Sequence, residues 1–153
     1  MDYKNVFLNY LSKNPKFLDV ILDFIVDAFL IINKQGEILK VNQNLTDILN
    51  YSKEELLAMN LEDLEEENKI FEHLNSIEPN SSYCTQSIFK TAQGKIKNFE
   101  ITVTLVNQLE ETIFLIVAHD ITDYKQKENK LLKAYQENQD FVDELRKQRN
   151  RIN

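Results

Sequence analysis

Short stretches in which apolar and polar residues alternate predict the strands of this protein. Residues 28–33 and 38–41 are mostly aliphatic and are separated by Lys34-Gln35-Gly36-Glu37, a run of turn-forming residues, so they predict a β-hairpin. Apolar side chains recur at every second position in later stretches, which predict three more strands: residues 83–91, 96–106 and 112–119. The pattern therefore predicts one five-stranded sheet with a buried face.

Helical spacing of apolar residues predicts the elements around this sheet. Residues 2–12 have an amphipathic pattern, and Asn14 followed by Pro15 is typical of the start of a second helix. The acidic residues 63–68 are predicted to lie in solvent. Strands and helices in this order indicate the α+β class. Between the second and third strands the same spacing predicts three short helices: residues 44–49, a capped helix after Ser52, and residues 70–77.

The last part of the chain predicts a coiled coil. From Asp120 onward there is no strong turn residue, and spacings of three and four place ten side chains at the a and d positions of one helix: Ile121, Tyr124, Glu128, Leu131, Tyr135, Asn138, Val142, Leu145, Arg149 and Ile152. An isolated polar helix of this length needs a partner, so we predict a homodimer paired through it. The centre of this dimer seam consists of Leu131, Tyr135, Asn138, Val142 and Leu145. The chain thus divides into an N-terminal helix (1–15), a central domain (16–119) and a coiled-coil helix (120–153).

The composition excludes several classes of function. With 18 Lys and Arg residues against 25 Asp and Glu residues, the net charge is −7, which disfavours binding to nucleic acid or to an anionic membrane. A single cysteine, Cys84, rules out an intrachain disulfide and a cysteine zinc cluster, and two distant histidines offer little material for acid–base catalysis. No apolar run is long enough to cross a bilayer. We therefore expect a cytoplasmic protein with no metal site, no membrane insertion and no enzymatic activity.

Three groups of motifs resemble those of PAS domains. Residues 27–42 and the segment Leu49-Asn50-Tyr51-Ser52-Lys53-Glu54-Glu55-Leu56 resemble the first half of such a domain. Residues 90–94 resemble the turn between the third and fourth PAS strands. His119-Asp120-Ile121-Thr122 resembles the closing Asp-Ile-Thr motif that precedes a signalling helix, with His119 in place of a common Arg and Asn50 in place of a common Gly. The likeness covers about residues 16–131.

The resemblance implies a fold and a binding site. A PAS-like fold is a five-stranded antiparallel sheet of order 2-1-5-4-3 with short helices on one face, here with an N-terminal helical cap and a long C-terminal coiled-coil helix. Between the helices and the sheet, a pocket for a small apolar ligand would be lined by Ile31, Ile48, Phe71, Phe99, Ile101, Val103, Phe114, Ile116 and Ala118. The same residues fit a plain hydrophobic core, which is the interpretation we favour.

The sequence predicts no cofactor. In haem-binding PAS sensors the axial histidine lies in a helix that corresponds to the one carrying His73, which makes haem the main alternative. The acidic and polar neighbours of His73 favour an ordinary surface histidine instead. A flavin adduct is disfavoured, because the Asn-Cys-Arg run of flavin photoreceptors does not follow the capped helix and Cys84 is predicted on a strand.

By resemblance, the chain is expected to be a sensory and dimerisation module. It would sense a small ligand or a partner and transmit a conformational change through its C-terminal helix to an output domain that is not in this chain, such as a kinase or cyclase. The signal would pass the junction formed by Asp120, Ile121 and Thr122, where Asp or Thr can fix the angle of the helix start. The alternative is a ligand-free PAS-like dimerisation or adaptor module.

Overall fold

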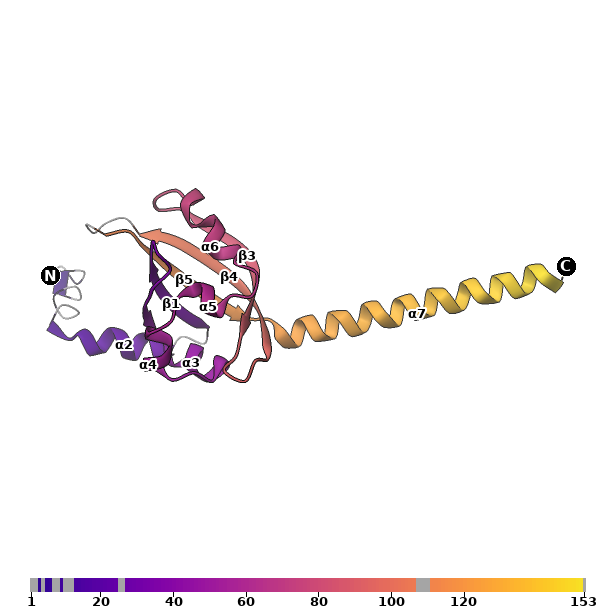
Figure 1. The fold of residues 1–153 in the computed structure, drawn as a ribbon, viewed down its shortest axis with the longest axis horizontal. Coiled ribbons are helices and arrows are strands. Elements are labelled where there is room, and N and C mark those ends of the chain that lie inside the picture. Colours follow the sequence, from indigo (N-terminus) through magenta and orange to yellow (C-terminus); the bar gives the residue numbers. More distant parts are fainter. Residues whose placement is uncertain are drawn as a thin grey trace. The chain divides into compact units, whose positions relative to one another are not determined.

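The computed structural model describes residues 3, 5, 6, 9, 13–24, 27–106 and 111–152, so most of the predicted helix over 2–12 lies outside the described residues. The chain forms two compact units, residues 1–120 and residues 121–153. The first unit contains the sheet and the short helices, and the second is one long helix (Figure 1).

Five strands form one antiparallel sheet in the order β2-β1-β5-β4-β3. β5 is central because it pairs with β1 on one side and with β4 on the other, whereas β2 and β3 are the two edges. The predicted hairpin, the three later strands and the expected strand order are confirmed. The strands are β1 (Ala28–Asn33), β2 (Ile38–Val41), β3 (Ser82–Lys90), β4 (Ile96–Val106) and β5 (Ile113–Asp120).

A block of short helices lies between β2 and β3 in the sequence and covers one face of the sheet (Figure 1). Buried apolar side chains from this block and from alternate strand positions form a single core cluster. Helix α2 (Pro15–Phe24) precedes β1, as the Asn14-Pro15 motif predicts. The block consists of α3 (Gln43–Leu49), α4 (Lys53–Leu57), α5 (Leu61–Leu64), α6 (Lys69–His73) and the 3₁₀ helix η1 (Leu74–Ser76).

Polar side chains determine where these short helices begin and end. Asn42 precedes α3, and its Oδ1 accepts a hydrogen bond from Leu45 N at 3.1 Å. Ser52 begins α4 in the same way, because its Oγ accepts from Glu55 N at 3.1 Å, as its motif predicts. Asn50 ends α3 in the left-handed conformation with φ of 61°, which Asn adopts more readily than most residues. Local sequence therefore sets the bounds of the block.

Residues 63–68 form only in part the solvated segment that the sequence predicts, because Asp63 and residues 66–68 are exposed whereas Leu64 and Glu65 are buried. Asn60 and Asp63 form a reciprocal capping box that begins α5, and the side chain of Leu64 is fully buried in the core. The abundance of acidic residues concealed this helix, because its two buried leucines, Leu61 and Leu64, lie within one turn and are too few to form a periodic pattern. The capping box was the local signal that could have predicted it.

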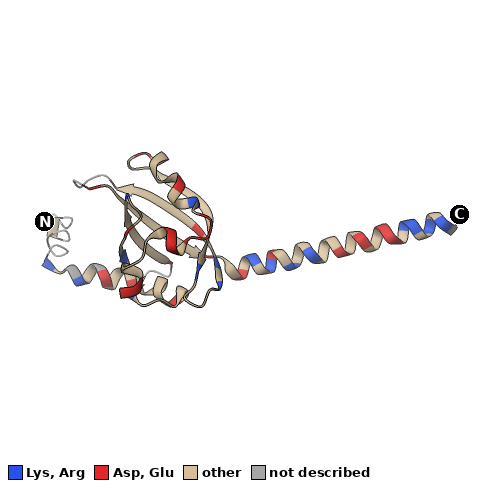
Figure 2. Cartoon of the chain, in the orientation of Figure 1, with Lys and Arg blue, Asp and Glu red and all other residues tan. Residues whose placement is uncertain are grey.

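Helix α7 (Thr122–Ile152) extends over 31 residues. Its charges are grouped: residues 125–133 are mostly basic, the charged residues of 137–144 are acidic, and the last turns are basic (Figure 2). Asp123 in the first turn and Arg149 and Arg151 in the last turn complement the helix dipole. Among the helices in the described ranges, none has the length and apolar content needed to span a membrane.

Candidate functional site

Most of the residues predicted to line a pocket are part of the packed core. Ile48 and Phe71 are half-buried and pack against the core cluster. The side chains on β4 and β5 share one face because they occupy alternate positions along their strands. These six belong to the cluster and are at most 2% exposed: Phe99, Ile101, Val103, Phe114, Ile116 and Ala118.

Ile31 does not face the helices, so its assignment to the pocket was wrong. On β1, Leu30 and Ile32 are fully buried in the core cluster, whereas Ile31 is half-buried and outside it. Successive side chains of a strand point to opposite faces, so Ile31 points away from the core. It lies opposite Lys40 of β2 and Leu115 of β5. The β1 contribution to the core comes from its two neighbours.

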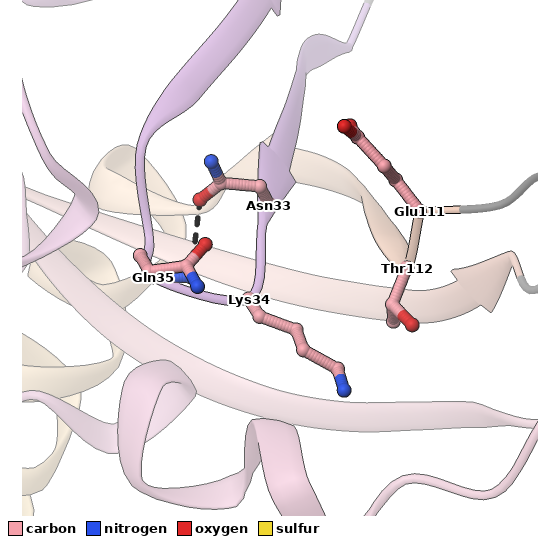
Figure 3. A pocket seen from close by; sticks show the side chains of 5 residues that line it. All are labelled: Asn33, Lys34, Gln35, Glu111 and Thr112. Atoms are coloured by element: carbon pink, nitrogen blue, oxygen red, sulfur yellow. Dashed lines mark hydrogen bonds between the residues drawn. The ribbon is translucent and has the colours of Figure 1, made fainter.

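Two hollows in the surface lie away from the predicted pocket residues. One, of about 340 Å³, is formed by polar side chains at the β1–β2 turn and just before β5, which Figure 3 shows: Asn33, Lys34, Gln35, Glu111 and Thr112. The other, of about 400 Å³, is lined by residues 37–39 and 57–60 together with Asp63. Neither hollow includes a residue predicted to bind an apolar ligand. The polar lining of the first is unsuited to such a ligand.

A buried carboxylate joins the helical block to β3. Glu65 is 4% exposed, and its side chain accepts hydrogen bonds from Ile70 N at 3.0 Å and from the hydroxyl of Ser87. The backbone of the same segment reaches the strand, since Glu66 N donates to Ile88 O at 2.8 Å. Because Glu65 has donors from both sides, its burial leaves no unpaired acceptor.

An ion pair connects the residue before β1 to the end of β5. His119 Nδ1 lies 2.7 Å from Asp27 Oδ1. The hydrogen bond to Asp27 and then its negative charge raise the pKa of His119 above its ordinary value, and Glu100 and Asp120 add to this effect. Glu100 lies directly opposite His119 on β4. Asp120 ends β5 and Thr122 begins α7, so the ion pair immediately precedes the predicted signal junction.

His73, the candidate haem ligand, lies at the surface of the domain. It is the last residue of α6 and is exposed. Its Nδ1 donates a hydrogen bond to the carbonyl oxygen of Lys69 at 2.7 Å, and its ring stacks on Tyr83 with 4.9 Å between the ring centroids. These contacts favour a surface histidine over a ligand in an enclosed haem pocket. Within the described ranges, no group of three or more His, Cys, Asp and Glu residues could hold a metal ion.

Three apolar residues at the centre of the α7 seam are exposed, and the fourth, Val142, is half-buried. Leu131 is 72% exposed, Tyr135 is 64% exposed and Leu145 is 49% exposed. Leu132 and Phe141, at the e and g positions beside the seam, are 59% and 63% exposed. An apolar stripe of this length on a polar helix is typical of a surface that pairs with another helix.

The sequence matches the profile of one protein family. The PAS domain profile covers residues 26–123, which is more than half of the chain. This chain belongs to the PAS domain family. The match includes all five strands and the helical block, and it ends at the second residue of α7. No curated protein sequence matches the chain.

Solved PAS domains share the fold of this chain at low sequence identity. The PAS domain of an HTR-like protein from Haloarcula marismortui has a TM-score of 0.67 at 18% identity, over 76% of this chain and 99% of its own. A PAS domain from a two-component sensor histidine kinase has a TM-score of 0.64 at 21% identity, over 71% and 97%. The PAS domain of nitrogen regulation protein NR(II) from Vibrio parahaemolyticus has a TM-score of 0.56 at 19% identity, over 68% and 97%. The expected PAS-like fold is confirmed.

Two polar contacts of this PAS domain were not predicted from the sequence. Asp27 and His119 are 92 residues apart, and Glu65 and Ser87 are 22 residues apart. No local pattern pairs residues at such separations, because each pair forms only when the sheet has assembled. Each contact joins two segments of the domain that are distant in the sequence.

Proposed function

We propose that this PAS domain is a sensory and dimerisation module. It receives a small ligand or a protein partner and passes a conformational change through α7 to an output domain, such as a kinase or cyclase, while it catalyses no reaction itself. One observation supports this most. β5, the central strand, is followed after the single residue Ile121 by α7, whose seam carries exposed apolar side chains. A displacement of β5 therefore acts on the first turn of α7 across one residue.

The similar solved domains support a role in signalling. One is described as part of a two-component sensor histidine kinase and another as part of a nitrogen regulation protein. Both are named for signalling or regulation. The proposal extends that role to this chain, whose long helix follows the domain.

The partner of α7 in this proposal is the α7 of a second copy. In a parallel pair, Asn138 lies opposite its own copy, and the two amides can exchange hydrogen bonds. A shifted register would place the amide against Val142 or Tyr135 and leave it unpaired. Glu128 and Arg149 each face a like charge in the same arrangement, so the pairing is weak. A weak pairing suits a helix that changes between two states.

Removal of α7 tests this proposal. Truncation of the chain after Thr122 is expected to lower the dimer fraction in sedimentation at tens of micromolar protein, because the seam is lost. Asn138→Leu is expected to raise the dimer fraction and to relax the register, because a buried amide weakens a coiled coil.

Asn129→Leu is the matched control for the seam variant. Asn129 is exposed on the same helix but lies outside the seam, so this substitution is expected to leave the dimer fraction unchanged. The proposal is wrong if the full chain sediments as a monomer under these conditions. It is equally wrong if the truncated chain dimerises as tightly as the full chain.

A ligand-free dimerisation or adaptor module is the second candidate, and the packing of the core favours it. The β4 and β5 residues predicted to line a pocket are buried against one another, and the two hollows described above are elsewhere. Native mass spectrometry of the purified full chain, with an absorption spectrum, separates the two candidates. A co-purified small molecule supports a ligand sensor, and an empty dimer supports an adaptor. A haem absorption band that disappears in His73→Ala would add a cofactor to the proposal.

A further inference from the structure

Within the described part of the chain, the edge strand β3 has one covered half and one open half. Glu66 N donates to Ile88 O, and the Glu66 carboxylate forms an ion pair with Lys90 at 3.0 Å, so the segment before α6 covers the C-terminal half of the edge. The other half holds three exposed, uncharged residues: Ser82, Cys84 and Gln86. An edge without charged residues or proline is a template for pairing with another strand.

Two hydrogen bonds determine which peptide groups of β3 point to the open edge. Ile88 O points away from β4, because Glu66 N bonds to it from outside the sheet. Thr91 N points toward β4, because it donates to Lys95 O at 2.8 Å. Peptide groups alternate between the two sides of a strand. The even-numbered residues 82, 84 and 86 therefore direct their N–H and C=O groups to the open edge.

We propose that this edge pairs with the same edge of a second copy, antiparallel, about a two-fold axis at Cys84. In that register Cys84 lies opposite Cys84 of the second copy, and Ser82 lies opposite Gln86. The three facing pairs can exchange up to six hydrogen bonds. The carbonyl of Gln86, which accepts from the Thr85 hydroxyl at 3.3 Å, would then accept from a backbone N–H. No like charges face each other, because the three side chains are uncharged.

The two ends of the open edge favour the same edge of a second copy as its pairing partner. Asn80 has φ of 61°, and its N–H donates to Leu105 O at 3.4 Å, so the chain joins the edge only at Ser82. In the proposed register, Asn80 of the second copy lies opposite Ile88, where Glu66 already occupies the edge. β3 of the second copy thus leaves the edge before it reaches Ile88 of the first copy, where Glu66 already covers that edge.

Other antiparallel registers pair fewer residues. A shift of one pair in one direction places Ser82 opposite Ile88, whose carbonyl is already bonded to Glu66. A shift in the other direction places Gln86 opposite Asn80, whose N–H is bonded to β4. Only the register centred on Cys84 pairs all three open residues. This surface lies on β3 and does not involve α7, so the inference does not depend on the proposed function.

Disulfide cross-linking in the full chain tests the register. Facing residues of this kind have Cα atoms about 5.5 Å apart, which a disulfide can bridge. Two chains, both carrying Cys84→Ser, are used: one with Ser82→Cys and one with Gln86→Cys. Diamide accepts the two electrons and two protons when the thiols form a disulfide. We expect the mixed dimer to form at least about tenfold faster than either homodimer, because pairing raises the effective concentration of the facing thiols.

Two controls make this result specific. Lys95→Cys in the same Cys84→Ser background places an exposed thiol at the β3–β4 turn and measures random collision. Gln86→Pro removes one outward N–H without removing a bond to β4, and it is expected to slow the cross-linking of the natural Cys84. An α7-paired dimer alone gives no preference for the 82–86 pair. Equal rates for the mixed and like pairs, or a mixed rate no higher than that of Lys95→Cys, would overturn the inference.

Discussion

A single buried amide connects three elements of this PAS domain. Asn42 is 2% exposed. Its Oδ1 accepts hydrogen bonds from Phe29 N at 3.0 Å and Leu45 N at 3.1 Å, and its Nδ2 donates to Leu22 O and Asp27 O, both at 3.0 Å. All four hydrogen-bonding positions of the amide are used. The helix cap is a contact between residues close in the sequence, whereas the bonds to α2 and to the residue before β1 depend on the assembled fold.

The ion pair between His119 and Asp27 makes stability depend on pH. Because Asp27 raises the pKa of His119 above 6.5, the folded protein binds the imidazolium proton more tightly than the unfolded chain does. The stabilisation is complete below the ordinary histidine pKa and is lost as the pH rises through the raised pKa. In Asp27→Asn, we expect NMR titration to give a lower His119 pKa and denaturant unfolding to show a smaller loss of stability over this pH range.

The control for this prediction is a carboxylate on a different element. Asp143→Asn removes an exposed carboxylate of α7 that does not contribute to the shift of His119, so the His119 titration should not change. If Asp27→Asn also leaves the pKa of His119 unchanged, the ion pair does not form in solution.

At the scale of elements, the sequence predicts the features that depend on residues close together in the chain. β4 has the predicted bounds because apolar and polar residues alternate along it between two turns. β1 is different, since its residues 28–32 are all apolar and carry no alternation. Its pairing with β5 decides that Ile32 faces the helices and Ile31 does not. A strand whose consecutive residues are all apolar therefore hides its orientation from sequence analysis.

The candidate pocket could be predicted only as a set of wall residues. Eight of the nine predicted residues lie in the core cluster or against it, and Ile31 does not. An apolar pocket and an apolar core have the same pattern along the chain. They differ in the volume left between elements, which depends on side chains from the helical block and from the sheet together. No segment of the sequence contains that information.

The contact between α5 and β3 gives a prediction at the same scale. Ser87→Ala removes the hydroxyl that donates to the buried Glu65 carboxylate and leaves one of its oxygens with fewer donors. We expect the free energy of unfolding to fall by about 1–3 kcal/mol in denaturant titration. Ser81→Ala is the matched control, because the Ser81 hydroxyl is bonded to Glu78 O at an exposed site. An equal effect of the two substitutions would show that the Glu65–Ser87 contact contributes no specific stability.

At the scale of the whole molecule, the two units differ in how they bury apolar surface. Residues 1–120 include one core cluster, whereas α7 has large apolar side chains that are about half to three-quarters exposed. A polar helix with such a stripe gains little stability by itself. The proposed dimerisation would bury that stripe, and the proposed pairing of β3 would cover a second surface. Pairing of α7 is therefore the step at which this exposed apolar stripe can be buried.

We expect the core of the first unit to be tightly packed. Ile101 is fully buried on β4, opposite Ala118 of β5, so Ile101→Trp must insert a larger side chain into a filled cluster. We expect it to lower the free energy of unfolding by about 1–3 kcal/mol or more in denaturant titration, because overpacking displaces neighbouring side chains. Ile96→Trp, the same substitution at a 54% exposed position of the same strand, should have little effect. If Ile101→Trp instead retains full stability and loses a small molecule that co-purifies with the unaltered protein, the cluster encloses a ligand site. That result would support the proposal of a ligand sensor.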